Sequence, residues 1–177
     1  AGFKILYSTD YIKEACQTLE QNNIGQVVEC MDIREINFNS IPERFGIDRV
    51  DVLVGGPPCP AYSKSRFYIK DKKRALEDEN AFTLYEYFRA VEELNPKIFF
   101  FENVHGFVYK PHIEAFNLLK QRSKELGYEI SYDVFNAADF GVPQTRERFI
   151  CVGVKKEAGG KFIIPKPTHY NPDKYDF

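Results

Sequence analysis

The sequence predicts an open α/β sheet joined by right-handed crossovers. Apolar runs of strand length alternate along the chain with stretches of helical periodicity. The run over residues 97–101 is apolar on both faces, as expected of a buried parallel strand. The chain has 177 residues, of which 44% are hydrophobic and 28% charged, which is typical of one globular domain and excludes a disordered chain.

The first part of the chain predicts a strand, a helix and a second strand. Residues 3–7 are a short apolar run, and residues 11–21 form a helix because their apolar side chains fall on one stripe. Thr9 and Asp10 provide its N-cap. The second strand is expected at residues 26–30, after the asparagines and the glycine that end the helix.

The central part predicts a strand, a helix and another strand. The strand over residues 50–54 runs into the Gly-Gly-Pro-Pro sequence at 55–58, which neither a helix nor a central strand could continue. A polar loop and a helix over residues 80–94 follow, and an Asn-Pro pair closes that helix. The buried strand over residues 97–101 comes next.

The last part predicts a helix and two paired strands. The helix covers residues 111–126, with a glycine well placed as its C-terminal cap. The strands are expected at residues 128–135 and 149–154. The tail after residue 158 is rich in Pro, Lys and Asp, which is typical of a linker.

Charge and composition limit the functional class. The formal net charge of −2 argues against a self-sufficient basic nucleic-acid binder, although not against part of one. No apolar run approaches the roughly 20 residues of a membrane span, and the N-terminus does not resemble a signal peptide. We therefore expect no association with membranes.

The cysteines and histidines do not predict a metal site. None of the four cysteines has zinc-like C-x-x-C spacing, and the three histidines are too scattered for a local site. Four thiols in a chain of this length do not look like a secreted disulfide framework. We therefore expect reduced thiols in a cytoplasmic protein, with no metal cofactor.

Candidate functional residues follow predicted strands. Ligands of open α/β sheets bind outside the carboxyl ends of the strands, so polar or reactive side chains at these ends are candidates. Four residues meet this criterion: Asp10, Asp32, Cys59 and Glu102.

Each candidate motif has a purely structural alternative. A lone thiol such as Cys59 is more often a packed core residue, but it rarely follows a Gly-Gly-Pro-Pro turn. Glu102 is either solvated at the sheet edge or held in a pocket where it can deliver a proton. The segment 144–148 is either a polar strand end with ion pairs or a site whose residues Gln144, Arg146 and Arg148 share a strand face.

Three motifs together resemble those of the C5-cytosine DNA methyltransferases. They are Pro57-Pro58-Cys59, Glu102-Asn103-Val104 and Gln144-Thr145-Arg146-Glu147-Arg148, in family order and each at a predicted strand end. The resemblance extends from Tyr7 to His169. It implies a Rossmann-like, S-adenosylmethionine-dependent methyltransferase sheet with helices on both faces.

The resemblance also implies roles for individual residues. Cys59 matches the nucleophile that attacks C6 of a flipped-out cytosine, and Glu102 matches the acid that engages N3 and the exocyclic amine. Arg146 matches the arginine that helps to hold the flipped base. The residues expected to brace the site or bind substrate are Ser63, Lys64, Arg66, Asn103, Gln144 and Arg148.

The methyl donor implied by the resemblance is S-adenosylmethionine. Asp10 matches the acid that binds the ribose hydroxyls, and Tyr11 is placed to stack on adenine. Asp32 and Ile33 match the pair that contacts the adenine amine and face. The residues expected to lie against the donor near the nucleophile are Gly56 and Pro58.

The loop after Cys59 is strongly basic, in contrast to the chain as a whole. Such a loop is either a solvated surface segment or, as the resemblance implies, one that closes over double-stranded DNA and contacts phosphates. Its six basic residues against one acid, Asp71, are Lys64, Arg66, Lys70, Lys72, Lys73 and Arg74.

The sequence also departs from the family pattern. Pro60 and Tyr62 stand where the family most often has Gln and Phe or Trp. The glycine-rich first motif and the target recognition region are absent, so we expect a partial catalytic domain over residues 1–158 and a linker over 159–177. We further expect the first, central strand of the sheet to be missing.

The missing strand predicts a dependence on a partner. It would leave unpaired backbone groups on two strand edges, each costing about 1–3 kcal/mol when buried. We therefore expect this chain to be inactive alone and to need a companion chain, unless it is a fragment of a longer polypeptide.

Three other functions compete with DNA methylation. They are a catalytically silent homologue that stimulates a partner, an unrelated cysteine hydrolase with His105 as its base, and an RNA cytosine methyltransferase. The expected location is the bacterial cytoplasm or nucleoid. The recognised DNA site, and the choice between restriction–modification and regulation, stay open because the base-reading region is absent.

Overall fold

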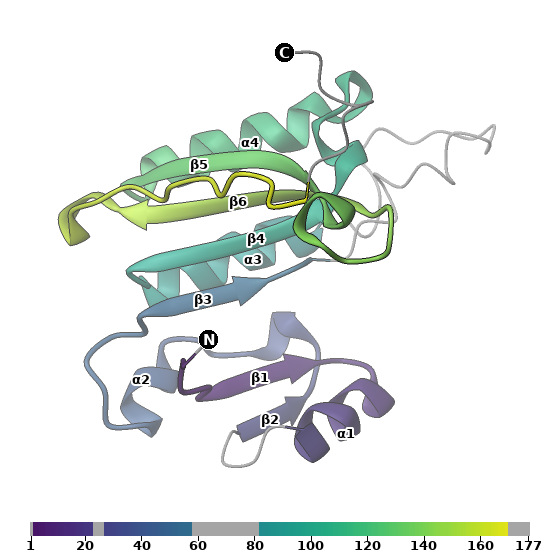
Figure 1. The fold of residues 1–177 in the computed structure, drawn as a ribbon. Coiled ribbons are helices and arrows are strands. Elements are labelled where there is room, and N and C mark those ends of the chain that lie inside the picture. Colours follow the sequence, from purple (N-terminus) through teal and green to yellow (C-terminus); the bar gives the residue numbers. More distant parts are fainter. Residues whose placement is uncertain (1, 23–26, 58–81, 170–177) are drawn as a thin grey trace.

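The computed structural model describes residues 2–22, 27–57 and 82–169. Figure 1 shows the arrangement of their helices and strands. In chain order the elements are β1 (Tyr7–Asp10), α1 (Lys13–Asn22), β2 (Val27–Cys30), η1 (Ile33–Glu35), α2 (Ser40–Arg44), β3 (Val52–Gly55), α3 (Phe82–Leu94), β4 (Ile98–Val104), η4 (His105–Val108), η5 (Lys110–His112), α4 (Ile113–Glu125), β5 (Tyr128–Asn136), η6 (Ala137–Phe140), β6 (Glu147–Lys155) and η7 (Lys156–Ala158).

The strands form two sheets. Strands β1 and β2 pair in parallel, and the second sheet has the order β3-β4-β6-β5. Strand β3 runs parallel to β4, whereas β6 runs antiparallel to both β4 and β5. Helices α3 and α4 lie against one face of the four-stranded sheet (Figure 1). The α/β class predicted from the sequence is confirmed.

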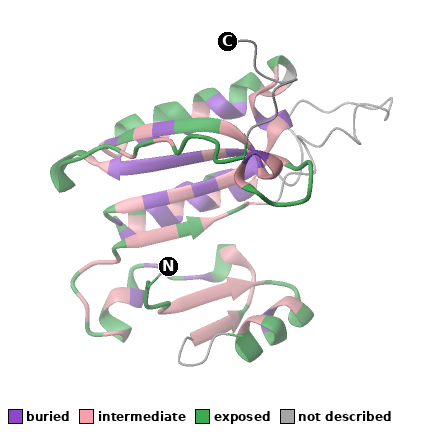
Figure 2. Cartoon of the chain, viewed as in Figure 1, coloured by how far each residue is buried: buried purple, intermediate pink, exposed green. Residues whose placement is uncertain are grey.

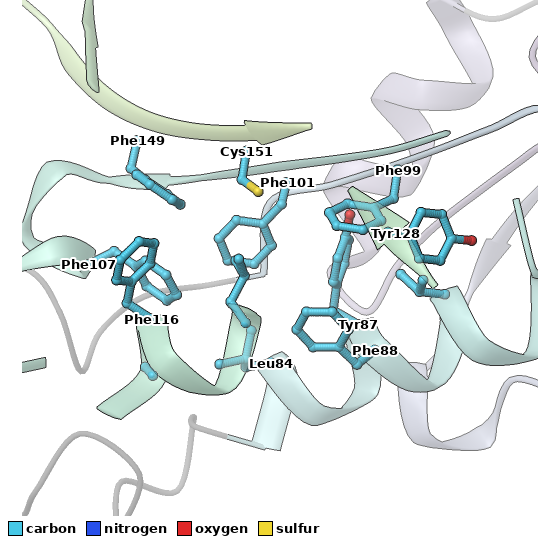
Figure 3. Packing of buried hydrophobic residues seen from close by; sticks show 13 residues of the cluster. Leu84, Tyr87, Phe88, Phe99, Phe101, Phe107, Phe116, Tyr128, Phe149 and Cys151 are labelled. Carbon is cyan, nitrogen blue, oxygen red and sulfur yellow. The ribbon is translucent and has the colours of Figure 1, made fainter. Parts of the chain in front are cut away.

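Aromatic side chains fill the main core, between the four-stranded sheet and helices α3 and α4. Phe99 and Phe101 of β4 are fully buried, and Figure 3 shows their rings among those contributed by the surrounding elements. Tyr87 of α3 packs edge-on against both rings and donates a hydrogen bond from its hydroxyl to the carbonyl of Phe100 at 3.0 Å. This bond satisfies the only polar atom that the Tyr87 side chain brings into the core.

Gly153 of β6 makes room for this core. It pairs with Phe99, and a Cβ at position 153 would lie 2.1 Å from the Phe99 ring. The ring therefore lies directly over the backbone of β6, which only glycine permits.

A second apolar cluster lies on the side of helix α3 toward the two-stranded sheet. Ile36, Phe38 and Ile41 pack with Ala90 and Leu94 of α3. The segment that follows β2 is thereby attached to the helix that covers β4.

Arg89 of α3 reinforces this attachment. Its guanidinium donates to the carbonyls of Ile33 and Ile36 at 2.7 and 2.9 Å and lies over the ring of Phe38. It also forms ion pairs with Glu86 and Glu93 on its own helix. One side chain therefore joins five groups across the two parts of the chain.

The first strand begins later than predicted. The expectation of a strand over residues 3–7 is wrong, because pairing with β2 starts at Tyr7↔Val27 and extends to Asp10↔Cys30. Phe3 is 70% exposed and Ile5 49% exposed. Asp10, predicted as a helix cap, is the last residue of β1 and still accepts a hydrogen bond from the Ile12 amide at 2.8 Å.

Strands β4, β5 and β6 are longer than predicted. The strand expected to end at residue 101 continues to Val104, since β6 pairs with it as far as Val104↔Arg148. Strand β5 likewise extends to Asn136 because it pairs with Glu147. The short helix α2 was not expected.

The two sheets are not joined by a ladder. Among the described residues, β1 bonds only to β2, and β3 bonds only to β4. Val54 of β3 is 68% exposed, and β1 and β2 are half-buried along most of their length (Figure 2), with Cys30 at the end of β2 exposed. The sheet is thus interrupted between the first two strands and the rest, where the sequence predicted a missing strand.

Candidate functional site

Glu102 and Arg148 form an ion pair on neighbouring strands. Val104 is opposite Arg148 and Glu102 is opposite Ile150. Because directly opposed residues share a face, and alternate residues do too, Glu102 and Arg148 are diagonal neighbours on one face. Arg148 Nε lies 2.7 Å from Glu102 Oε1, and both side chains are partly exposed. The pair can therefore fix the carboxylate while leaving it accessible.

The end of β3 lies against the same carboxylate. A Cβ on Gly56 would be 3.1 Å from Glu102 Oε2, closer than most real Cβ contacts. Asn103, almost fully buried, donates from Nδ2 to the Pro57 carbonyl at 3.4 Å. Its Oδ1 accepts from the Val104 amide at 2.8 Å. The segment leading to Cys59 is thus attached to β4 beside Glu102.

The residues predicted to continue this segment lie outside the described part of the chain. They include the expected nucleophile and all six basic residues of the loop expected to contact phosphates. Their predicted roles stay predictions. These residues are Pro58, Cys59, Pro60, Tyr62, Ser63, Lys64, Arg66, Lys70, Lys72, Lys73 and Arg74.

The loop before β6 does not have the geometry that the sequence suggested. Gln144, Arg146 and Arg148 were expected to share a strand face, but β6 begins only at Glu147. The amide of Gln144 bonds to the Val142 carbonyl at 2.7 Å, which bends the chain before the strand. The structure therefore brings Arg148 to Glu102, whereas Gln144 and Arg146 lie exposed outside the strand.

Asn136 positions the backbone of this loop. Its Oδ1 accepts from the amides of Ala138 and Arg146 at 3.2 and 3.1 Å. The Ala137 amide in turn bonds to the Arg146 carbonyl at 3.0 Å. Asn136 is buried, so its side chain links the end of β5 to the start of β6.

A second acid, Glu147, precedes Arg148 in β6 and contacts His105. Glu147 Oε2 lies 2.9 Å from His105 Nδ1, and the Tyr109 hydroxyl is 3.4 Å from the same nitrogen. Arg148 also donates from Nη1 to the backbone carbonyl of Glu147 at 2.8 Å. His105 thus contacts an acid in the described structure, while its suggested relation to Cys59 is untested.

The predicted donor residues lie at the ends of the other sheet. Asp10 ends β1, and Asp32, two residues after the end of β2, caps η1. Because the strands are parallel, both carboxylates lie toward the same edge. Tyr11, expected to stack on adenine, is 71% exposed, and Ile33 is partly buried.

Asp32 is held as an anion. Its Oδ1 accepts from the backbone amide and Nε of Arg34, both at 2.9 Å. Hydrogen bonds from the Arg34 side chain and then from its amide lower the Asp32 pKa to about 2. Each carboxylate oxygen has two lone pairs, so this pairing leaves acceptor capacity for a ligand hydroxyl or amine.

The polar groups at this edge are of the kind that can bind S-adenosylmethionine. Two acids, Asp10 and Asp32, are available at adjacent strand ends for polar groups of a nucleoside. Gly56, which has no side chain, follows β3 and lies against the Glu102 carboxylate. Within residues 2–22, 27–57 and 82–169, no cluster of three or more His, Cys, Asp or Glu could hold a metal.

Some site residues could have been found from the sequence and others could not. Asn136 follows a predicted strand directly, so the criterion that selected Glu102 also applies to it. The pairing of Glu147 with His105 depends on the β4–β6 register, and Arg89 lies mid-helix with no motif around it.

Among the described residues, no helix is long and apolar enough to cross a membrane.

Comparison with solved structures defines the class of protein. The fold matches a putative DNA modification methyltransferase encoded within a prophage (E. coli), with a TM-score of 0.68 and 27% sequence identity. The match covers 89% of this chain and 42% of that one. The structure is therefore an S-adenosylmethionine-dependent methyltransferase fold, as the motifs implied.

The sequence comparison identifies the family. Residues 1–176 match the family described as C-5 cytosine-specific DNA methylase, and the chain belongs to this family. It is 37% identical over 175 residues to the type II methyltransferase M.SacI of Streptomyces achromogenes, covering 98% of this chain and 44% of that protein. It is 35% identical over 179 residues to M.AquIA of Picosynechococcus, covering 96% and 69% respectively. The chain thus spans about half the length of several relatives.

Proposed function

We propose that this chain transfers a methyl group from S-adenosylmethionine to C5 of cytosine in double-stranded DNA. The observation that carries the proposal is the Glu102–Arg148 ion pair beside Gly56, in a chain of the C-5 cytosine-specific family. Cys59 follows Gly56 by three residues in the sequence, and the proposal therefore assigns the acid Glu102 and the nucleophile Cys59 to the same base.

In this mechanism the Cys59 thiolate attacks C6 of the cytosine. The new Sγ–C6 bond moves the electron pair of the C5–C6 double bond to C5, which then accepts the methyl group. S-adenosylmethionine, when bound, supplies that methyl group from its sulfonium centre. A base removes the C5 proton, and the Sγ–C6 bond breaks to restore the double bond and the thiolate.

Glu102 and the two arginines act on the base. Glu102 holds a proton at N3 and contacts the exocyclic amine, which stabilises the charge that develops during attack. Arg148 orients the Glu102 carboxylate through the 2.7 Å contact. Arg146 helps to hold the flipped base, Asn103 and Gln144 brace the site, and the basic loop that begins at Lys64 contacts DNA phosphates.

In this proposal the two sheets bind different substrates, the two-stranded sheet the methyl donor and the four-stranded sheet the cytosine. Asp10 and Tyr11 bind the ribose and adenine of the donor, and Asp32 and Ile33 contact the adenine amine and face. The donor's methyl end then lies toward Gly56 and Pro58. In this proposal residues 1–158 form part of the catalytic domain, and residues 159–177 form a linker toward a target recognition region.

We further propose that a strand parallel to β1 and β3 pairs between them in the active protein. Each of these strands has one hydrogen-bonded neighbour among the described residues, and Val54 is exposed at the edge. The strand comes from a longer polypeptide or from a companion chain. Methyl transfer by the 177-residue chain alone would contradict this proposal.

Covalent trapping tests the chemistry. DNA that contains 5-fluorocytosine blocks release, because fluorine replaces the C5 proton that must leave. In the assembly that supplies the missing strand, incubation with the methyl donor should give a protein–DNA adduct that resists denaturation. Cys59→Ser should abolish the adduct, whereas the matched control Cys30→Ser, which changes an exposed thiol, should retain it.

The trapping outcomes separate the alternatives. An adduct with Cys59→Ser would show that the nucleophile is assigned incorrectly. Trapping on fluorinated RNA but not on DNA would favour an RNA cytosine methyltransferase. No adduct in any assembly would favour a silent homologue. Glu102→Gln should slow adduct formation about a hundredfold, in the range of lost acid–base catalysis.

A further inference from the structure

His105 and Glu147 occupy the position directly beyond the β4–β6 ladder. The last paired residues are Val104 and Arg148. The next pair in the antiparallel register would be His105 and Glu147, but β4 leaves the sheet there and turns into η4. At this position the 2.9 Å contact between His105 Nδ1 and Glu147 Oε2, and not a ladder of backbone hydrogen bonds, joins the two segments of the chain.

This contact lies behind the face that carries Glu102 and Arg148. Side chains alternate across a strand, so Glu147 shares a face with Phe149 and not with Arg148. Phe149 is buried against the aromatic core on the side of α4. Glu147 therefore lies on the helix-covered face, and its neighbour Arg148 lies on the face of the candidate site.

Tyr109 supports the histidine. Its ring packs edge-on against the His105 ring with centroids 4.8 Å apart, and its hydroxyl lies 3.4 Å from Nδ1. The side chains of His105 and Glu147 are 29% and 36% exposed. The histidine is thus held by an aromatic neighbour and by the acid while part of its surface stays in solvent.

Arg148 depends on the backbone that Glu147 supplies. Its Nη1 donates to the Glu147 carbonyl at 2.8 Å while its Nε contacts Glu102. The residues before Glu147 form no strand, so the start of β6 has a loop on one side. A shift of the Glu147 backbone would therefore move the guanidinium relative to the Glu102 carboxylate.

We propose that His105 and Glu147 are a pair of positioning residues that hold the start of β6 and so keep Arg148 against Glu102. The proposal rests on the proposed function, because Glu102 is taken as the residue that engages the cytosine. Neither member of the pair touches the reacting atoms. The pair acts through Arg148, and this dependence makes it testable.

The first experiment measures methyl transfer in the assembly in which the unmodified chain is active. His105→Ala should lower kcat about tenfold or more, since small misplacements of catalytic groups have large effects, and should leave the KM for S-adenosylmethionine unchanged. His105→Asn should restore kcat to within about twofold of the unmodified protein, because its amide can replace Nδ1 as the partner of Glu147. Failure of the asparagine to restore kcat would contradict the proposal.

The effect of His105→Ala is next measured in a protein that already carries Arg148→Lys, which tests whether the pair acts through Arg148. If the pair acts through Arg148, adding His105→Ala to Arg148→Lys should lower kcat by less than about twofold, because coupled residues are not additive. An equal loss in both backgrounds would overturn the proposal. Glu129→Gln, which breaks the exposed Lys161–Glu129 contact on β5, is the matched control and should leave kcat unchanged.

Thermal unfolding separates this inference from the proposed function. If the unmodified protein neither methylates nor traps cytosine, the proposed function fails and the positioning role fails with it. If methylation occurs, and His105→Ala and Glu147→Ala lower Tm non-additively without changing kcat, the contact is only structural and the proposal is overturned. A lower kcat at a temperature where every variant is fully folded supports it.

Discussion

The two sheets of this molecule differ in how completely their strands are paired and buried. In the four-stranded sheet, β4 is paired on both sides and carries two fully buried phenylalanines. In the two-stranded sheet, every residue of β1 is only half-buried, and within the described helix α1 beside it only Cys16 is buried. The proposed cytosine site is on the first sheet and the proposed donor site on the second.

The difference shows that the two proposed sites are held in place by different contacts. The geometry of Glu102 and Arg148 follows from a ladder and a packed core within the described residues. The position of Asp32 relative to that site depends on the second apolar cluster and on Arg89. The donor side therefore requires more support from outside its own sheet.

The largest expected effect is on the four-stranded sheet. Phe99→Ala should lower the free energy of unfolding by about 3–5 kcal/mol, because it leaves a cavity among tightly packed rings. Urea denaturation measures this change. Tyr85→Ala, at a half-exposed position on α3, is the control and should stay within about 0.5 kcal/mol. A loss below 1 kcal/mol for Phe99→Ala would contradict the account of a rigid core.

A smaller effect should fall on the connection between the sheets. Arg89→Met should lower the free energy of unfolding by about 1–3 kcal/mol, since the carbonyls of Ile33 and Ile36 lose their donor. Amide hydrogen exchange should accelerate in β1 and β2 but not in β4 and β6. The matched control is Arg122→Met, whose ion pairs are on the helix surface. Equal acceleration of amide hydrogen exchange in both sheets would contradict the view that Arg89 supports mainly the two-stranded sheet.

The smallest effect concerns the pH dependence of the donor side. The pKa of Asp32 is about 2 in the folded protein and near 3.8 otherwise, so its pairing with Arg34 stabilises the fold above about pH 4. That stability is lost as the pH falls from about 4 toward 2. The difference in Tm between the unmodified protein and Asp32→Asn, measured without donor, should shrink over this window.

Arg34→Met tests the origin of this pH dependence. Without the guanidinium, the side-chain hydrogen bonds that lower the Asp32 pKa are gone, so its contribution over pH 4 to 2 should largely disappear. An unchanged pH dependence in Arg34→Met would show that the pair is not its source.

Local patterns were sufficient to predict the class of fold and the sequence of strands and helices. Element ends were harder, because they depend on pairing partners distant in the chain. Glu102 was expected after a strand and lies within β4, since β6 extends the ladder to Val104. The first strand was placed four residues too early, because the apolar run at residues 3–7 does not reveal where β2 begins to pair.

The candidate site shows the same limit. The motifs selected Glu102 and the two arginines, but sequence spacing alone could not establish which arginine contacts the acid. The bend at Gln144 and the late start of β6 determine that Arg148 does. The His105–Glu147 contact was beyond reach because it depends on register across 42 residues.

The close approach of Gly56 to Glu102 affects how mutagenesis of this site should be interpreted. Alanine is the usual substitution for removing a side chain, but at position 56 it adds a carbon 3.1 Å from a carboxylate oxygen. A loss of activity in Gly56→Ala would therefore report a displaced Glu102, even if position 56 never touches donor or DNA. In a scan of this region, the glycine measures crowding, whereas its neighbours measure lost contacts.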